Sequence, residues 1–371
     1  MASIQTTPNG SYQVRYQDGS GKHRAKTFPK GQKELAKKFL HSVQSDIDAG
    51  RHIITERGAT LVPEFVQEWH DGRVDIAVST RSRSQGIITG HITPKWSRKK
   101  ISDINHADVQ RWVSELLDAG QSPRSAKKIV NLLSQALDAA VKDRRLSSNP
   151  AEGVRFPRAK PRAKIYLSAD QVEQLASVVD DRQRVIIYVL AYTGLRWGEL
   201  AGLRVKDLDP VRRRLNVEQT IVDDNGRSLV KPPKDNEIRS VPAPRFVIDM
   251  LVEQSQGLGQ DDLLFRSPRG GPLRNRNERV RWFDAAAEAI GEPDLTPHGL
   301  RHTAASLAIS AGASVLAVQR MLGHSSATVT LDTYSALFDG DLDELADRLD
   351  RVRADTRLRD SYVTPTDEAS G

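Results

Sequence analysis

The residues of this chain that could do chemistry are a set of basic side chains followed, near the C-terminus, by one tyrosine. In chain order they are Arg196, His298, Arg301, His324 and Tyr334. Arginine presents a planar fork of N–H donors that matches the non-bridging oxygens of a phosphate. A tyrosine hydroxyl can be a covalent nucleophile once a neighbouring group accepts its proton. These residue types therefore predict attack on a phosphodiester without a metal ion.

Each of these side chains has a distinct expected role. Tyr334 is the nucleophile, and because a phenol has a pKa of about 10, it must give its proton to a base during attack. His298 is the candidate base. Arg196 and Arg301 hold the scissile phosphate and stabilise the negative charge that grows on its oxygens in the transition state. His324 donates a hydrogen bond to one of those oxygens.

The neighbouring residues indicate how the two arginines are positioned. Arg196 begins a helix, whose N-terminus attracts anions. Glu199 follows one turn later, where it either holds Arg196 in place or is an ordinary exposed helix acid. Thr296-Pro297 opens another helix, which places His298 and Arg301 on one face so that both can point at a single phosphate.

Taken singly, these residues have ordinary structural explanations. A tyrosine after amphipathic sequence is most often a packed aromatic, and a helical arginine most often forms a surface ion pair. A lone histidine is usually structural, and His302 is interpreted in that way, as a packing or supporting residue. The other side chains are assigned to chemistry because they occur together and in one order.

The order of four motifs resembles that of the tyrosine recombinases, and within them the phage integrases, especially those of mycobacteriophages. The motifs are Arg196-x-x-Glu199-Leu200, His298-x-x-Arg301-His302, Leu322-Gly323-His324 and Thr330-x-x-x-Tyr334. The likeness is strongest from about Ile165 to about Leu349. It implies a site-specific DNA recombinase that cleaves and rejoins DNA through a 3′-phosphotyrosyl intermediate. Such an enzyme integrates a phage genome and, with an accessory factor, excises it.

The resemblance also implies a lysine on a hairpin, which protonates the departing 5′-hydroxyl. Lys234 occupies the matching place in Lys231-Pro232-Pro233-Lys234-Asp235. Asp235 departs from the family pattern, in which Thr or Ser more often stands beside this lysine. Lys231 is a nearby competitor, and the sequence leaves the choice between the two open.

Composition and missing motifs limit the other possibilities. The net charge of +7 and pI near 9.5 favour a polyanionic partner without requiring one. Neither a metal-ligand spacing nor a Gly-x-x-x-x-Gly-Lys loop occurs, and there is no cysteine. We therefore expect no cofactor, metal or ATP. No apolar run is long enough for a bilayer or a signal peptide, so the expected location is the bacterial cytoplasm, on DNA.

At 371 residues, the chain is too long for one ordinary core. The expected architecture is multidomain, with a small N-terminal α+β arm-binding domain, an all-α core-binding domain and an α-rich (α+β) catalytic domain of tyrosine-recombinase type. The expected boundaries are residues 1–58 for the arm-type DNA-binding domain, 60–150 for the helical core-binding domain, 151–164 for a linker, 165–340 for the catalytic domain, and 341–371 for a C-terminal helix and disordered tail.

Local patterns place the elements within these domains. Tyr12, Val14 and Tyr16 alternate with polar residues as in a half-buried strand, and residues 31–49 carry apolar residues, beginning with Leu35, at helical spacing. Segments 215–222, 228–230 and 239–241 are expected to form one short antiparallel sheet.

Other patterns predict helix ends in the same domains. Asn105 and Ser122 are expected to cap helices, Ser168 begins a capping box with Gln171, and Gly194 ends a buried helix.

The resemblance further implies partners. These are double-stranded DNA attachment sites, three further copies of the chain in a homotetramer on DNA, a host DNA-bending factor and an excisionase. Leu342, Leu345, Leu349 and Val352 predict an amphipathic tail helix. It docks either on its own subunit or, as the resemblance favours, on a neighbour.

Two other functions remain open: a type IB topoisomerase-like strand transferase and a non-catalytic DNA-binding regulator. The sequence does not name the attachment sites, the direction of the reaction or the accessory proteins.

Overall fold

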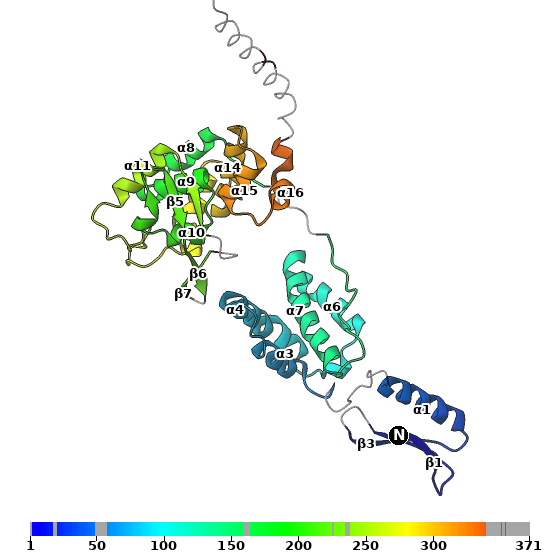
Figure 1. The fold of residues 1–371 in the computed structure, drawn as a ribbon. Coiled ribbons are helices and arrows are strands. Elements are labelled where there is room, and N and C mark those ends of the chain that lie inside the picture. The colour runs from blue at the N-terminus through cyan, green and yellow to red at the C-terminus, as the bar shows by residue number, and fades with distance from the viewer. Residues whose placement is uncertain are drawn as a thin grey trace, which may run out of the picture. The chain divides into compact units, whose positions relative to one another are not determined.

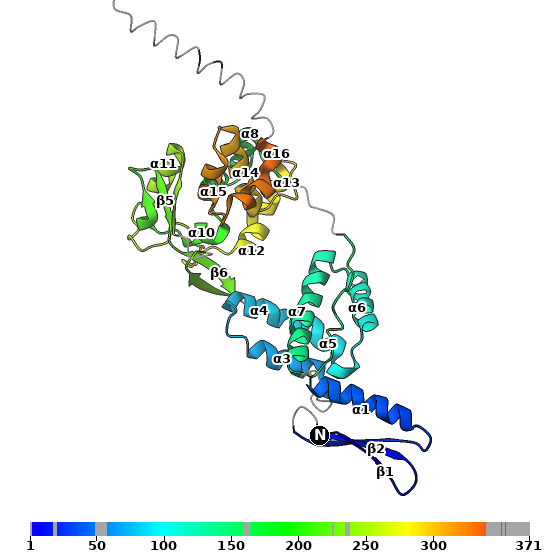
Figure 2. The same ribbon diagram turned by 45° about the vertical axis from the view of Figure 1, so that its right-hand side comes forward.

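The computed structural model of the chain describes residues 2–17, 21–48, 58–158, 164–224, 226–233 and 238–338, together with positions 350 and 353. It divides into two compact units, residues 1–161 and 162–371 (Figure 1; Figure 2). The tail helix expected over Leu342–Val352 and residues 159–163 of the expected linker lie outside the described residues. None of the described helices is long and apolar enough to cross a membrane.

The first unit begins with a small antiparallel sheet and one helix, as the residue alternation predicts. Their bounds are β1 (Ser3–Thr6), β2 (Tyr12–Gln17), β3 (His23–Phe28) and α1 (Lys33–Asp48), with β2 in the middle. Val14 of β2 is buried, and Phe39 of α1 packs against the rings of Tyr16 and Phe28. The spacing of apolar residues placed Leu35 on this face, but Leu35 is 53% exposed because Ala36 takes the buried position instead.

The rest of the first unit is helical. Its helices are α3 (Val62–Asp71), α4 (Val78–Ile87), α5 (Thr93–Trp96), α6 (His106–Asp118) and α7 (Pro123–Lys142). The side chains of Asn105 and Ser122 accept hydrogen bonds from backbone N–H groups at the starts of α6 and α7, so both expected caps are present. Trp96 and Trp112 meet edge to face, with ring centroids 5.5 Å apart, in the core of these helices.

The second unit is α-rich with short strands. Its helices are α8 (Ala169–Ser177), α9 (Asp181–Thr193), α10 (Trp197–Gly202), α11 (Arg245–Gln254), α12 (Asn275–Glu278), α13 (Asp284–Ala289), α14 (Pro297–Ser310), α15 (Val315–Leu322) and α16 (Ala327–Phe338). Ser168 forms the expected capping box with Gln171 at the start of α8. Helix α9 lies in the middle of the core and packs along α14 (Figure 1).

The strands of the second unit form two sheets, so the expectation of a single sheet was wrong. Their bounds are β4 (Leu208–Asp209), β5 (Arg214–Val217), β6 (Thr220–Asp224), β7 (Arg227–Lys231) and β8 (Arg239–Pro242). Strand β5 pairs with β4 and β8, whereas β6 pairs with β7. The expected strand 215–222 breaks at Gln219, whose side-chain amide donates to the carbonyl of Gly202 (2.8 Å) and takes that position out of the alternation.

Two helix ends of the second unit need glycine. Gly194 ends α9 with φ +66°, and Gly323 ends α15 with φ +62°, both in the left-handed region. A Cβ on Gly194 would lie 2.5 Å from Cδ2 of Leu322 and 3.3 Å from Cβ of Ala304. The end of α9 is therefore packed directly against the middle of α14 and the end of α15.

Replacing Gly194 with alanine should destabilise the second unit more than backbone strain alone. Gly257→Ala is the matched control, because Gly257 has φ +76° and nothing within 4 Å of its added Cβ. The control should cost about 1–2 kcal/mol for the left-handed conformation, and Gly194→Ala a further 1–3 kcal/mol, roughly, for overpacking. Free energies of unfolding from urea titrations followed by circular dichroism measure this difference. Equal losses in the two variants would show that the contact of the helix ends is loose.

Candidate active site

The second unit brings the predicted side chains to one place where several helix ends meet. Arg196 precedes α10, and His298 and Arg301 lie on the first turns of α14. His324 follows the end of α15, and Tyr334 lies on α16. These elements are joined by the contacts described below, so residues separated by up to 138 positions share one small region.

Arg301 is buried, with 3% of its surface exposed. Its Nη1 donates to the carbonyl of Gly194 (2.6 Å) and its Nη2 to the carbonyl of Leu322 (2.7 Å), which are the ends of α9 and α15. Burial, and then the positive charge of Arg196, lower the pKa of Arg301 to about 10. The guanidinium therefore stays charged at neutral pH. Because these contacts use two of its five N–H groups, the same guanidinium can donate to a phosphate as well.

Arg196 is held by Glu199, which is 1% exposed and so is not a solvated helix acid. The carboxylate accepts from Nη1 of Arg196 (2.9 Å) and from its backbone N–H (2.8 Å). Nη2 of Arg196 donates to the carbonyl of Gly323 (3.2 Å). The guanidinium is thus fixed between the start of α10 and the end of α15, while 31% of the Arg196 side chain remains exposed to solvent.

Arg239 also binds Glu199, a contact that sequence reasoning missed because no local pattern indicates it. Its Nη1 and Nη2 donate to the two carboxylate oxygens at 2.9 and 2.7 Å. Burial alone would raise the pKa of Glu199, but the hydrogen bonds and charge of Arg239, followed by those of Arg196, lower it below the ordinary value. Glu199 is therefore an ionised carboxylate shared by two arginines.

Tyr334 is 1% exposed, and its hydroxyl lies 2.9 Å from Nδ1 of His302. Burial is the main reason why its pKa is raised to about 12, and the charge of Arg301 opposes this rise. Tyr166 packs against the same phenol, with ring centroids 6.4 Å apart. His302 thus contacts the predicted nucleophile directly, which sequence reasoning missed. Its position next to Arg301 on α14 was the available signal.

His298 is exposed at the first turn of α14 and packs edge to face against His302, with ring centroids 5.1 Å apart. Desolvation by its neighbours, followed by the charges of Arg301 and Arg196, lowers the pKa of His298. It is therefore a neutral imidazole near both guanidiniums at neutral pH, which is the state in which an imidazole accepts a proton.

His324 is half-buried, and its ring is stacked nearly parallel to Tyr334 with centroids 6.4 Å apart. Its Nδ1 is 2.9 Å from the hydroxyl of Thr330, a buried residue of α16. Burial, and then the charges of Arg301 and Arg196, lower its pKa to about 4. If the Thr330 hydroxyl donates to Nδ1, the proton of the neutral ring is on Nε2, which can then donate to a phosphate oxygen.

The structure does not describe the predicted lysine. Lys234 lies outside the described residues, and Lys231, its competitor, is the last residue of β7. Across the described ranges, no cluster of three or more His, Cys, Asp or Glu side chains is arranged to hold a metal ion.

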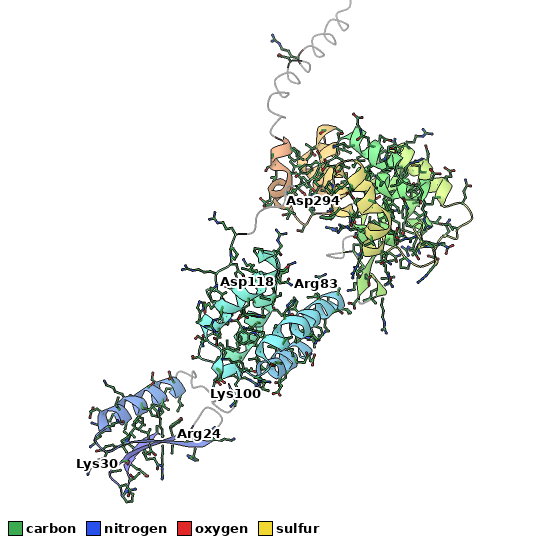
Figure 3. The ribbon with its side chains drawn as sticks, turned by 180° about the vertical axis from the view of Figure 1, so that it is seen from behind. Arg24, Lys30, Arg83, Lys100, Asp118 and Asp294 are labelled. Carbon is green, nitrogen blue, oxygen red and sulfur yellow. The ribbon has the colours of Figure 1, made fainter. Side chains whose placement is uncertain are left out.

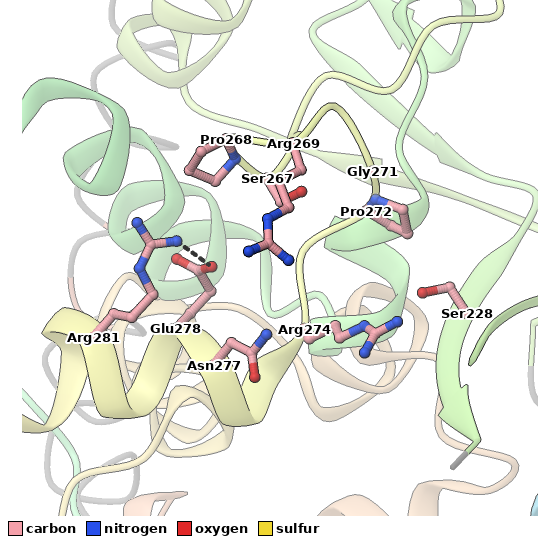
Figure 4. Close-up of a pocket in the computed structure, with 10 residues that line it drawn as sticks. All are labelled: Ser228, Ser267, Pro268, Arg269, Gly271, Pro272, Arg274, Asn277, Glu278 and Arg281. Atoms are coloured by element: carbon pink, nitrogen blue, oxygen red, sulfur yellow. Dashed lines mark ion pairs between the residues drawn. The ribbon is translucent and has the colours of Figure 1, made fainter. Parts of the chain in front are cut away.

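A pocket of the second unit is lined by none of the predicted residues (Figure 4). Its lining includes three arginines and one ion pair, Arg281 to Glu278, whose Nη1 and Oε1 atoms are 3.8 Å apart. The lining residues are Ser228, Ser267, Pro268, Arg269, Gly271, Pro272, Arg274, Asn277, Glu278 and Arg281.

Comparisons with known proteins agree with this geometry. Residues 166–340 match the phage integrase family, and residues 61–117 match the phage integrase N-terminal SAM-like domain. The ICEBs1 integrase of Bacillus subtilis (strain 168) is 26% identical over 377 residues, 94% of this chain and 99% of that protein. The integrase of Mycobacterium phage D29 is 27% identical over 304 residues, 79% of each protein.

The fold is also shared with a solved structure. The crystal structure of a lambda integrase tetramer bound to a Holliday junction is similar with a TM-score of 0.59 and 21% identity. The match covers 89% of this chain and 94% of that one.

Proposed function

We propose a chemical mechanism for this chain, which belongs to the phage integrase family and is a tyrosine-type site-specific recombinase. Tyr334 attacks a DNA phosphate, its oxygen bonds to phosphorus, and the bond to the 5′-oxygen breaks. The products are a 3′-phosphotyrosyl link and a free 5′-hydroxyl. A 5′-hydroxyl from a second duplex then attacks that link and releases Tyr334. The energy of the phosphodiester is retained throughout, so the reaction consumes neither ATP nor another cofactor.

The arginines carry most of the stabilisation in this proposal. Negative charge grows on the non-bridging oxygens as the phosphorane forms, and donors already aimed at it stabilise it without reorganising. The observation that supports this assignment is the convergence of Arg196 and Arg301 on the carbonyls that end α9 and α15. These contacts fix both guanidiniums before DNA arrives. His324, beside the phenol of Tyr334, would donate to one of these two non-bridging oxygens as well.

Proton transfer is assigned to two histidines with different tasks. His298 is the proposed base, because it is exposed and lies beside the two guanidiniums that would hold the phosphate. His302 orients the phenol through the hydrogen bond between its Nδ1 and the hydroxyl of Tyr334. Lys234 is the proposed acid that protonates the departing 5′-oxygen, because an alkoxide is a poor leaving group.

The remaining parts are proposed to hold DNA. Basic residues lie on both parts of the first unit (Figure 3). Arg24 is on the N-terminal sheet, and Arg83 and Lys100 are in the helical part. Contacts of such residues with phosphates position a protein without reading sequence. We assign residues 1–58 to arm-type sites, 60–150 to the core site, and 165–340 to catalysis, with 151–164 as linker and 341–371 as tail.

The assembly is proposed by likeness to the solved tetramer on a Holliday junction. Four copies of the chain would hold two attachment sites in the bacterial cytoplasm, with the tail helix of one copy docked on the next. A DNA-bending host factor and an excisionase would set the direction of the reaction. A type IB topoisomerase-like enzyme would instead relax supercoiled DNA as a monomer, without a second site.

Tyr334→Phe should abolish the covalent protein–DNA adduct, because the attacking oxygen is removed while the ring is kept. The substrate is a pool of nicked duplexes of random sequence in the presence of a chelator. The nick releases the cleaved fragment and traps the adduct on a denaturing gel. The duplex recovered from the adduct then serves as the selected substrate. Tyr166→Phe is the matched control, since Tyr166 packs on the same ring, and it should still form the adduct. An adduct with Tyr334→Phe would refute the nucleophile.

His298→Gln and His302→Asn should differ in the pH dependence of cleavage of the selected duplex. In the unsubstituted chain the rate constant should be flat above pH 6.5 and fall below the lowered pKa of His298, as that ring takes up a proton. His298→Gln should slow cleavage about 10²–10⁴-fold and remove this fall. His302→Asn should retain the decrease of the rate constant at low pH, and its rate constant should be reduced less than that of His298→Gln. The reverse pattern would make His302 the base.

Lys234→Ala should slow cleavage about 10²–10⁴-fold, as expected for loss of a general acid, whereas Lys231→Ala should change it little. A selected duplex with sulfur in place of the bridging 5′-oxygen tests the assignment, because a thiolate leaves without a proton. This duplex should restore the rate of Lys234→Ala to nearly that of the unsubstituted chain. Rescue of Lys231→Ala instead would move the role to Lys231.

A further inference from the structure

We propose that Arg239 is a positioning residue for strand cleavage, which keeps Glu199 from neutralising Arg196 and fixes the end of α15 beside His324. This inference rests on the proposed function, because it concerns the rate of the same phosphoryl transfer. Arg239 does not reach the phosphate in this assignment. Its side chain is 10% exposed and lies across Glu199 from Arg196, whose side chain is 31% exposed.

The carboxylate of Glu199 is fully occupied. Oε1 accepts from Nη1 of Arg196 and Nη1 of Arg239, both at 2.9 Å. Oε2 accepts from the backbone N–H of Arg196 (2.8 Å) and from Nη2 of Arg239 (2.7 Å). Each oxygen thus accepts two charge-assisted or backbone hydrogen bonds, and Arg239 supplies the bidentate pair. If any one of these four donors were lost, a buried oxygen of Glu199 would be left with an unpaired lone pair, which is costly.

The charge balance of the three groups explains why a second arginine is needed. Glu199 is 1% exposed, so water does not screen its charge. A single buried pair of Arg196 and Glu199 would have no net charge, and the carboxylate would draw the guanidinium away from a phosphate. With Arg239 bound to the same carboxylate, the three groups carry a net charge of +1. Arg196 then keeps a positive charge to offer to the substrate.

Arg239 also contacts the segment that leads to His324. Its Nε donates to the carbonyl of Met321 at 3.4 Å, near the end of α15. A Cβ added to Gly323 would lie 2.9 Å from this Nε and 3.0 Å from Cδ of Arg239. The end of the Arg239 side chain is therefore packed against the glycine whose carbonyl accepts a hydrogen bond from Arg196 (3.2 Å). One side chain of β8 thus sets the place of both α10 and α15.

The test measures the rate constant for cleavage of the selected nicked duplex under single-turnover conditions with excess protein. Arg239→Met removes the charge and keeps the volume, and the rate should fall roughly tenfold to a hundredfold, the size of effect expected when a substrate-holding group is misplaced. The concentration of protein at half-saturation should stay within about twofold. Arg239→Lys keeps the charge without the bidentate geometry, so its rate constant should lie between those of the unsubstituted chain and Arg239→Met.

A second substitution separates charge balance from mere support. Adding Glu199→Gln to Arg239→Met removes the charge that draws Arg196 back, so the double variant should cleave faster than Arg239→Met. Arg204→Met is the matched structural control. Arg204 also forms a buried pair, with Asp207 (Nη2 to Oδ1, 2.9 Å), and binds the carboxylate through its backbone N–H, but away from the site. It should lower the unfolding temperature and leave the cleavage rate unchanged.

Three results would overturn the inference. They are an unchanged rate in Arg239→Met or Arg239→Lys, a double variant that cleaves no faster than Arg239→Met, or an equal loss of rate in Arg204→Met. If Arg239→Met does not fold, the comparison of Arg239→Lys with Arg204→Lys decides the question. Absence of any adduct in the unsubstituted chain is a different failure, because it would refute the proposed function itself.

Discussion

The buried carboxylate of Glu199 is the constraint on which the arrangement of the site depends. It binds the backbone and side chain of Arg196 at the start of α10, and it binds Arg239 from β8. A buried carboxylate without these partners would be unstable, so burial and pairing must form together. This requirement joins a helix start, a strand and, through Arg239, the end of α15. The proposed phosphate-binding group is thus a consequence of how the core closes.

The ends of helices supply the second part of the site. The carbonyls of Gly194, Leu322 and Gly323 accept hydrogen bonds from Arg301 and Arg196 at helix ends, where carbonyls lack partners within the helix. Both glycines adopt φ values near +60°, which other residues rarely do. The guanidiniums therefore satisfy buried carbonyls in the absence of substrate and still have further N–H groups for a phosphate. In the proposed mechanism, the two side chains that stabilise the fold are also the ones that bind the phosphate.

Much of this could be predicted from the sequence because the relevant interactions are local. Caps at Asn105, Ser122 and Ser168 join residues three apart, and Gly194 ends its helix by its own backbone preference. The set of chemical residues could be assembled because its members carry rare side-chain chemistry in a fixed order.

The features that escaped prediction are long-range. Arg239 is one of 55 lysines and arginines, and nothing local distinguishes it from a surface residue. Its contact with Glu199 spans 40 positions and exists only once β8 pairs with β5. The contact of His302 with Tyr334 likewise depends on how α16 packs against α14. The break of the expected strand at Gln219 depends on a carbonyl of α10, 17 positions away.

The central claim is that Arg196, Arg301, His324 and Tyr334 act on one phosphorus atom. A crystal structure of the full chain bound to the selected nicked duplex, with vanadate between Tyr334 and the 5′-hydroxyl, tests it most directly. We expect the vanadium to be bonded to the phenolic oxygen, with its equatorial oxygens about 2.7–3.1 Å from nitrogen atoms of Arg196, Arg301 and His324. Vanadate bound elsewhere, or bound to Tyr334 with both guanidiniums turned away from it, would contradict the account.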